Sequence, residues 1–126
     1  MEVIIRKAKE KEGKELARIE AACFPPAEAA SEAAILERLE AFPENFYVAE
    51  QNGKLVGFIN GGVTDEQYLP DEMYHDIGLH KPDGAYQTVF GLNVLSECRR
   101  QGIAEKLVNA FIEGAKQAGR KGVILT

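Results

Sequence analysis

Residues Glu97 to Leu107 read ECRRQGIAEKL, and this stretch decides the fold because it joins an apolar run to a helical pattern. The first turn of a helix leaves several backbone N–H groups without intrahelical partners, and the helix dipole adds about half a positive charge there. Because Gly102 has no Cβ, a phosphate can approach the backbone closely. The junction therefore predicts a phosphate or pyrophosphate site at residues 99–106. A helix start with solvated basic side chains is the alternative for so short a match.

The segments on either side of this junction predict a crossover between two parallel strands. Before it, YQTVFGLNVL (Tyr86 to Leu95) predicts one strand, in which Gly91 marks a bulge or a close backbone approach. After it, apolar residues follow one helical face from Ile103 to Ala118, and Gly119 stands where a C-cap glycine is typical. The closing GVILT (residues 122–126) predicts a strand parallel to the first.

The N-terminal third predicts a strand and two helices. Val3 to Ile5 is a β-branched run, and a helical pattern from Lys11 ends at Pro25-Pro26. Residues 29–41 are rich in alanine and glutamate and predict the second helix, with Ser31 as its cap. The residues expected on its inward face are Ala33, Leu36, Leu39 and Ala41.

The middle of the chain predicts a hairpin followed by a long connection. Two strand patterns, Phe46 to Glu50 and Lys54 to Val63, flank Asn52-Gly53, which suits the positive φ angles of a tight turn. Residues 64–84 form a polar connection, which either lines a substrate mouth or is a plain surface loop with one short helix at residues 70–74.

Composition limits the function classes. The 126 residues suit a single domain over the whole chain, and 45% of them are hydrophobic. A net charge of -5 argues against nucleic acid as a partner. No window reaches the roughly 18 apolar residues of a membrane span, and we do not expect the first residues, MEVIIRKAKEKEGKE, to act as a secretory signal. Cys23 and Cys98 stand far apart, which predicts free thiols in a reducing compartment, the cytoplasm.

The segment Arg99 to Ala104 also carries a family resemblance. It fits the (Q/R)-x-x-G-x-(G/A) signature of the GNAT superfamily of acetyl-coenzyme-A-dependent N-acetyltransferases. The predicted order strand–helix–helix–strand–strand–strand–helix–strand matches that family along the whole chain. The resemblance implies an α/β (α+β) fold with a mixed central sheet flanked by helices. CFPPAEAAS (Cys23 to Ser31), FPENFYVAEQNGKLVGFINGG and GLNVLSECRRQGIA look most similar to bacterial relatives of arylalkylamine N-acetyltransferase.

The resemblance implies a site for acetyl-coenzyme A and no metal. Backbone N–H groups from Gln101 to Lys106 would hold the pyrophosphate, and Leu92 to Val94 would pair with the pantetheine arm like an added strand. A backbone N–H near Asn93 or Val94 would polarise the thioester carbonyl. The cofactor residues implied in this way are Leu92, Asn93, Val94, Arg99, Arg100, Gln101, Gly102, Ile103, Ala104, Glu105 and Lys106.

Catalysis of acetyl transfer to an amine needs a base, and the sequence leaves that base open. The arylalkylamine branch uses a histidine pair, whereas the matching positions here are Thr88 and Phe90. The candidates are His75, Glu66, Tyr86 and Thr88, with Asp76 and Tyr68 beside them. Cys98 next to the predicted phosphate site is expected to be an ordinary loop residue.

The resemblance also raises an expectation about the C-terminal end. Family members continue past the strand matching residues 122–126 into a further helix, whose tyrosine commonly serves as the acid, and two more strands. We therefore expect a homodimer through Gly122 to Thr126, whose apolar edge would otherwise stay open. Three function classes follow: an N-acetyltransferase for a primary amine, arylalkylamine- or polyamine-like; a catalytically weak acetyl-coenzyme A-binding module; or a shortened remnant of such an enzyme.

Overall fold

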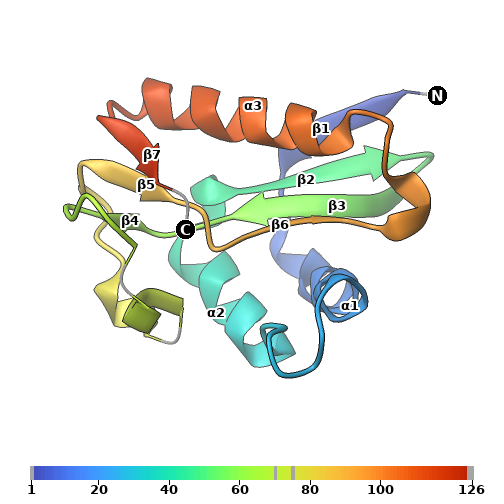
Figure 1. Cartoon of the computed structure of the whole chain (residues 1–126), viewed down its shortest axis with the longest axis horizontal. Coiled ribbons are helices and arrows are strands. Elements are labelled where there is room, and N and C mark those ends of the chain that lie inside the picture. Colours follow the sequence, from blue (N-terminus) through green and yellow to red (C-terminus); the bar gives the residue numbers. More distant parts are fainter. Residues whose placement is uncertain (1, 70, 75, 125–126) are drawn as a thin grey trace.

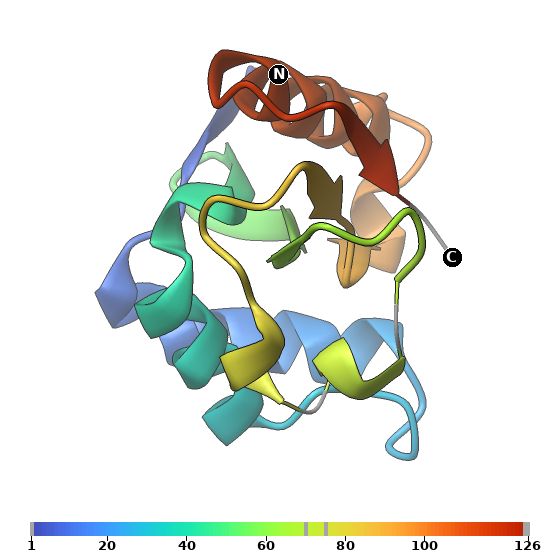
Figure 2. The same ribbon diagram turned by 90° about the vertical axis from the view of Figure 1, so that its left-hand side faces the viewer.

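The computed structural model describes residues 2–69, 71–74 and 76–124, and their strands lie between two layers of helices (Figure 1). Helix α3 (Ile103–Gln117) lies on one face, and α1 (Gly13–Cys23) and α2 (Glu32–Ala41) lie on the other. Figure 2 shows these layers from the side. The arrangement confirms the predicted α/β fold with flanking helices. No helix in the described part of the chain is long and apolar enough to cross a bilayer.

The strands form two sheets. The first is antiparallel, in the order β1-β2-β3-β6, and contains β1 (Val3–Lys7), β2 (Phe46–Gln51), β3 (Lys54–Asn60) and β6 (Gly91–Val94). The second, in the order β4-β5-β7, contains β4 (Val63–Thr64), β5 (Tyr86–Thr88) and β7 (Gly122–Ile124). Strands β5 and β7 run parallel, so β5, α3 and β7 form the predicted crossover.

The prediction of one strand from Tyr86 to Leu95 is wrong, because two consecutive amides bind to different sheets. Val89 donates its N–H to the carbonyl of Ile124 over 3.1 Å, whereas Phe90 donates to the carbonyl of Asn60 over 2.7 Å. The chain therefore leaves the second sheet and joins the first at this point. As a result β6 is an edge strand of the first sheet, whereas β7 belongs to the second.

The hairpin turn and the end of α3 have the predicted geometry, but the second hairpin strand, predicted to run to Val63, ends at Asn60, and Val63 begins β4 of the other sheet. Asn52 and Gly53 have φ angles of 56° and 78° between β2 and β3. Gly119 follows α3 with a φ of 79°, and the next N–H, that of Arg120, donates to the carbonyl of Ala115 over 3.0 Å. This is the hydrogen bond of a glycine-closed helix end.

Helix α2 begins later than predicted and turns a different face inward. The Ser31 hydroxyl accepts the N–H of Ala34 over 3.1 Å, which confirms the cap and starts the helix at Glu32. The prediction of its inward face is wrong except at Leu39, because Leu36 is 42% exposed and Ala33 and Ala41 are exposed too. The buried residues are Ile35, Arg38 and Leu39.

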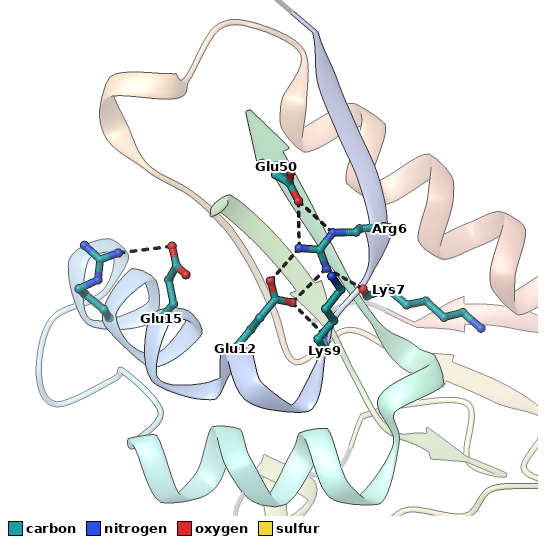
Figure 3. Close-up of polar contacts among 7 residues, drawn as sticks. Arg6, Lys7, Lys9, Glu12, Glu15 and Glu50 are labelled. Atoms are coloured by element: carbon teal, nitrogen blue, oxygen red, sulfur yellow. Dashed lines mark hydrogen bonds and ion pairs between the residues drawn. The ribbon is translucent and has the colours of Figure 1, made fainter. Parts of the chain in front are cut away.

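An ion-pair cluster fixes the start of α1 against the first sheet (Figure 3). Arg6 on β1 donates through Nη2 to Oε2 of Glu12 over 2.7 Å and through Nε to Oε1 of Glu50 over 3.0 Å. The hydrogen bonds from Arg6 lower the pKa of Glu12 below its ordinary value. Because Glu12 immediately precedes α1, the cluster helps to hold that helix, and the residues on it, in place.

The long connection contains two short 3₁₀ turns, Asp71–Tyr74 and Ile77–Leu79. The first confirms the short helix expected there. The side chain of Asp65 pairs with Lys81 and accepts the N–H of Ala85 over 3.0 Å, which ties the two ends of the connection together.

Candidate functional site

The turn before α3 presents backbone N–H groups that no side chain caps. Arg100 and Gly102 have φ angles of 67° and 77°, and Gly102 is the N-cap of the helix. The first helical hydrogen bond runs from Lys106 N–H to the carbonyl of Gly102 over 3.1 Å. The N–H groups of the preceding residues, Ile103 to Glu105, therefore have no intrahelical acceptor.

This helix start faces a hollow of about 170 Å³. Val94 at the end of β6 and Ala104 in α3 lie on its two sides, and the other lining residues are Cys98, Arg99, Arg100, Gly102 and Ile103. A Cβ added to Gly102 would meet no atom within 4 Å. The left-handed backbone, and not crowding by the protein, therefore favours glycine here, and the space in front of it is open.

Two of the polar side chains in the turn brace it. The Oε1 atom of Gln101 accepts a hydrogen bond from Nε2 of Gln51 over 3.0 Å, which ties the turn to the end of β2. Nε of Arg99 donates to the carbonyl of Val94 over 3.1 Å, so this arginine bends back toward β6. The second arginine of the turn, Arg100, has an exposed side chain.

Strand β6 offers half of its backbone groups to the space beside it. Leu95 donates its N–H to the carbonyl of Val56 on the β3 side over 2.9 Å. Because antiparallel pairing alternates, the backbone of Asn93 also faces β3, while that of Leu92 and Val94 faces away. The Val94 carbonyl accepts from Arg99 and from the thiol of Cys23, over 3.1 Å and 3.6 Å. The groups left at the open edge are the Val94 N–H and both polar groups of Leu92.

An apolar groove of about 240 Å³ lies along this open edge. It separates β6 from α3 and β7, and its lining residues are Ile59, Val89, Leu92, Val108, Phe111, Ile112 and Val123. Leu92 and Val94 thus line two hollows in succession, one apolar and one at the basic turn.

A third hollow, of about 410 Å³, lies on the α1 and α2 side of β6, and Glu20 lines it. Glu20 is only 6% exposed. Its Oε1 accepts from Nδ2 of Asn93 over 2.6 Å, and its Oε2 accepts the N–H of Ala30 over 2.9 Å. Asn93 therefore turns its side chain to a buried carboxylate while its neighbours Leu92 and Val94 turn to the opposite side.

Arg38 on α2 lines the same hollow and is also 6% exposed. Its guanidinium lies 4.9 Å from the ring centre of Phe90 and makes two long contacts, to Oδ1 of Asn60 over 3.5 Å and to the carbonyl of Tyr74 over 3.3 Å. Burial lowers the pKa of Arg38.

Sequence reasoning missed Glu20 and Arg38. Glu20 stands four residues after Leu16, and Arg38 stands three after Ile35, so each occupies the buried face of its helix. A charged residue at a buried position of a helical pattern was the signal that could have found them.

The predicted catalytic candidates lie elsewhere. Glu66 and Tyr68 line a separate hollow of about 510 Å³ beside the long connection, and Tyr86 accepts a hydrogen bond from Nε2 of Gln67 over 3.1 Å. Thr88 is buried and donates its hydroxyl to the carbonyl of Gly62 over 2.8 Å. None of these residues lines the hollow of Glu20. Asp76 accepts the N–H of Gly78, and His75 lies outside the described residues.

The two cysteines are free thiols, as predicted. Cys98 is 8% exposed and packs in the core between the first sheet and α3, which fits a structural role. Burial raises the pKa of Cys23. In the part of the chain that the structure describes, no three His, Cys, Asp or Glu side chains are grouped to hold a metal ion.

Strands β6 and β7 belong to different sheets, and the apolar groove between them and the basic turn at the start of α3 make up the candidate site. The family model described as the acetyltransferase (GNAT) family matches residues 13–126. The chain belongs to this family.

Individual relatives cover the chain well but are longer than it. "Probable hydrolase YhcX" of Bacillus subtilis strain 168 is 27% identical over an alignment of 132 positions, gaps included, that covers 98% of this chain and 25% of that protein. The loading GNATL domain of CurA from Lyngbya majuscula has a TM-score of 0.88 at 20% identity, over 99% of this chain and 64% of that one. The GphF GNAT-like decarboxylase, in complex with isobutyryl-CoA, has a TM-score of 0.82 at 27% identity, over 90% and 59%.

The chain thus spans a quarter of the curated relative and less than two thirds of these two structures. The closer likeness to arylalkylamine N-acetyltransferases stays a prediction, and so does the dimer, since only residues 122–124 of its expected interface are described.

Proposed function

We propose that the chain binds acetyl-coenzyme A along β6 and transfers the acetyl group to a primary amine of a small molecule. The observation that carries this proposal is the uncapped start of α3 at Gly102, which faces an open hollow beside two arginines. A diphosphate suits this place, because the free N–H groups, the helix dipole and the guanidinium groups all favour an anion.

The rest of the coenzyme would follow β6. The pantetheine amides would pair with the N–H and carbonyl of Leu92, and the apolar groove behind them would take the methylene groups. The N–H of Val94, which faces the same edge, would polarise the thioester carbonyl. Isobutyryl-CoA in the GphF structure, which is 27% identical, supports a thioester ligand of this kind.

The transfer needs a neutral amine. An alkylamine with the pKa of lysine, about 10.4, is only about 0.1% neutral at pH 7.4. Glu20 is the buried carboxylate nearest to this edge, because it is bonded to the side chain of Asn93 on β6. In the proposed reaction Glu20 takes one proton from the ammonium group, and the neutral nitrogen attacks the carbonyl carbon. The C–S bond then breaks while the nitrogen loses a second proton, which the departing thiolate takes up.

The test is release of free thiol from acetyl-coenzyme A with a panel of primary amines, including arylalkylamines and polyamines. We expect release that depends on the amine and falls about a hundredfold when Glu20 is replaced by glutamine. Binding of acetyl-coenzyme A without release for any amine would instead support a binding module. One observation favours that second function: Thr88 stands at one position of the histidine pair of the arylalkylamine branch, and its hydroxyl is already donated to the carbonyl of Gly62.

A further inference from the structure

Arg38 is a buried cation that forms no ion pair with any residue the structure describes. No described carboxylate lies within 4 Å of its nitrogen atoms, although four other ion pairs are present in the described residues. Glu20, on the same hollow, acts on Arg38 only through its longer-range field. Buried charges in proteins are ordinarily paired, because taking an unpaired charge out of water is costly.

The surroundings of Arg38 also hold more hydrogen-bond donors than acceptors. The guanidinium carries five N–H groups, whereas its two hydrogen-bond acceptors, on Asn60 and Tyr74, are at 3.5 Å and 3.3 Å. The amide of Asn60, which is fully buried, leaves its own Nδ2 donor without an acceptor. An anionic oxygen beside Arg38 would correct both deficits.

The hollow itself is of a size for a small molecule. Its volume of about 410 Å³ is within the usual range for ligand pockets, and apolar residues such as Phe24 and Phe90 line it together with the two buried charges. Glu20 and Arg38 present opposite charges to this space without forming an ion pair with each other.

We propose that the acceptor is an amine that carries its own carboxylate: Arg38 binds the carboxylate, and Glu20 receives the ammonium end and its proton. This inference rests on the proposed acetyl transfer, and it names an amino-acid-like acceptor in place of a polyamine. A carboxylate fits the guanidinium because two of its N–H groups can meet both oxygens.

The experiment compares 4-aminobutyrate with n-butylamine, two amines of the same length that differ only in the carboxylate. Their binding to the chain saturated with coenzyme A is measured by calorimetry, so that no turnover is needed. We expect 4-aminobutyrate to bind at least tenfold more tightly. Arg38→Met should abolish this preference, while Arg18→Met, at an exposed arginine of α1, should retain it.

A folding defect is separable from a binding defect. Removing an unpaired buried cation should leave the melting temperature unchanged or higher, and Arg38→Gln provides a second variant of different shape. In both Arg38 variants the affinity for coenzyme A should stay within twofold of wild type. If the wild-type chain itself does not bind coenzyme A, the proposed function is refuted.

Three results would overturn the inference. Equal binding of the two amines by wild type, or a preference that survives in both Arg38 variants, would exclude a carboxylate-binding role. A further calorimetry experiment compares the binding of malonyl-coenzyme A with that of acetyl-coenzyme A. If Arg38→Met selectively weakens the malonyl thioester and leaves amine binding unchanged, the carboxylate belongs to the acyl group and not to the acceptor.

Discussion

Nδ2 of Asn93 on β6 donates to Oε1 of Glu20 on α1 over 2.6 Å, in the interior of the molecule. Asn93 belongs to the strand whose open edge suits the thioester, and Glu20 lines the hollow on the opposite side of that strand. The hydrogen bond therefore connects the two halves of the proposed reaction, because it holds an acid–base group at a fixed place relative to the strand.

Glu20→Gln should lower kcat for acetyl transfer by about a hundredfold, since a positioned base typically contributes about 10² to 10⁴ in rate. Glutamine can still accept the hydrogen bond from Asn93, so the affinity for acetyl-coenzyme A should not change. Steady-state thiol release checks the rate, and calorimetry checks the affinity. Glu15→Gln on the same helix is the control. An active Glu20→Gln enzyme would remove Glu20 from the mechanism.

The ion-pair cluster predicts an effect on stability. Glu12→Gln should lower the free energy of unfolding by about 1–2 kcal/mol, because it weakens two charge-assisted bonds from Arg6. Glu15→Gln should cost less than about 0.5 kcal/mol, because its pair with Arg18 is exposed and 3.6 Å long. Urea unfolding measures both changes. If the two variants lose the same free energy of unfolding, the Arg6 cluster stabilises the fold no more than the exposed Glu15–Arg18 pair does.

The same cluster has a defined pH dependence. The pKa of Glu12 is lower in the folded state than in the unfolded chain, so its contribution is present above the unfolded value of about 4.5 and is lost as the pH falls. The stability difference between wild type and Glu12→Gln should therefore shrink below this pH. A difference that stays constant down to the folded pKa would contradict the assignment.

His80 predicts a second pH effect, in a higher range. Its Nδ1 accepts the N–H of Val63 over 2.9 Å, and burial lowers its pKa below the ordinary value of about 6.5 despite the opposing field of Glu44. The folded state therefore resists protonation, and stability should fall as the pH drops below about 6.5.

His80→Asn supplies an amide oxygen in place of Nδ1 and does not titrate. Unfolding in urea at several pH values should show a smaller slope between about pH 6.5 and pH 5 in this variant than in wild type. His75→Asn, which replaces the other histidine of the chain in the same way, is the matched control. The prediction fails if His80→Asn keeps the wild-type slope.

Much of the fold follows from local patterns in the sequence. Asn52-Gly53, Ser31 and Gly119 each act through a hydrogen bond or a φ angle within a few residues, so their structural roles were predictable. The split of the strand at Val89 and Phe90 was not, because an apolar run looks the same whether consecutive amides bind to one sheet or to two.

The candidate site was predictable only in part. Gly102 and its neighbours form a contiguous motif, whereas Glu20, Arg38 and Asn93 come from three elements and meet only after packing. Residues such as Glu66 and Tyr68 looked equally suited as catalytic groups in the sequence. The structure separates them from Glu20, because the long connection forms a hollow of its own.

The central claim, that the start of α3 holds the diphosphate of the coenzyme, is tested most directly by calorimetry of acetyl-coenzyme A with two glycine variants. Gly102 and Gly119 stand at opposite ends of α3, with φ angles of 77° and 79° and no atom within 4 Å of an added Cβ. Replacing either by glutamate imposes a similar backbone strain, but only Gly102→Glu places a carboxylate in front of the free N–H groups.

We predict that Gly102→Glu weakens the binding of acetyl-coenzyme A at least about tenfold, or about 1.4 kcal/mol, while Gly119→Glu binds like wild type. Wild-type affinity in Gly102→Glu, or an equal loss in both variants, would contradict the account.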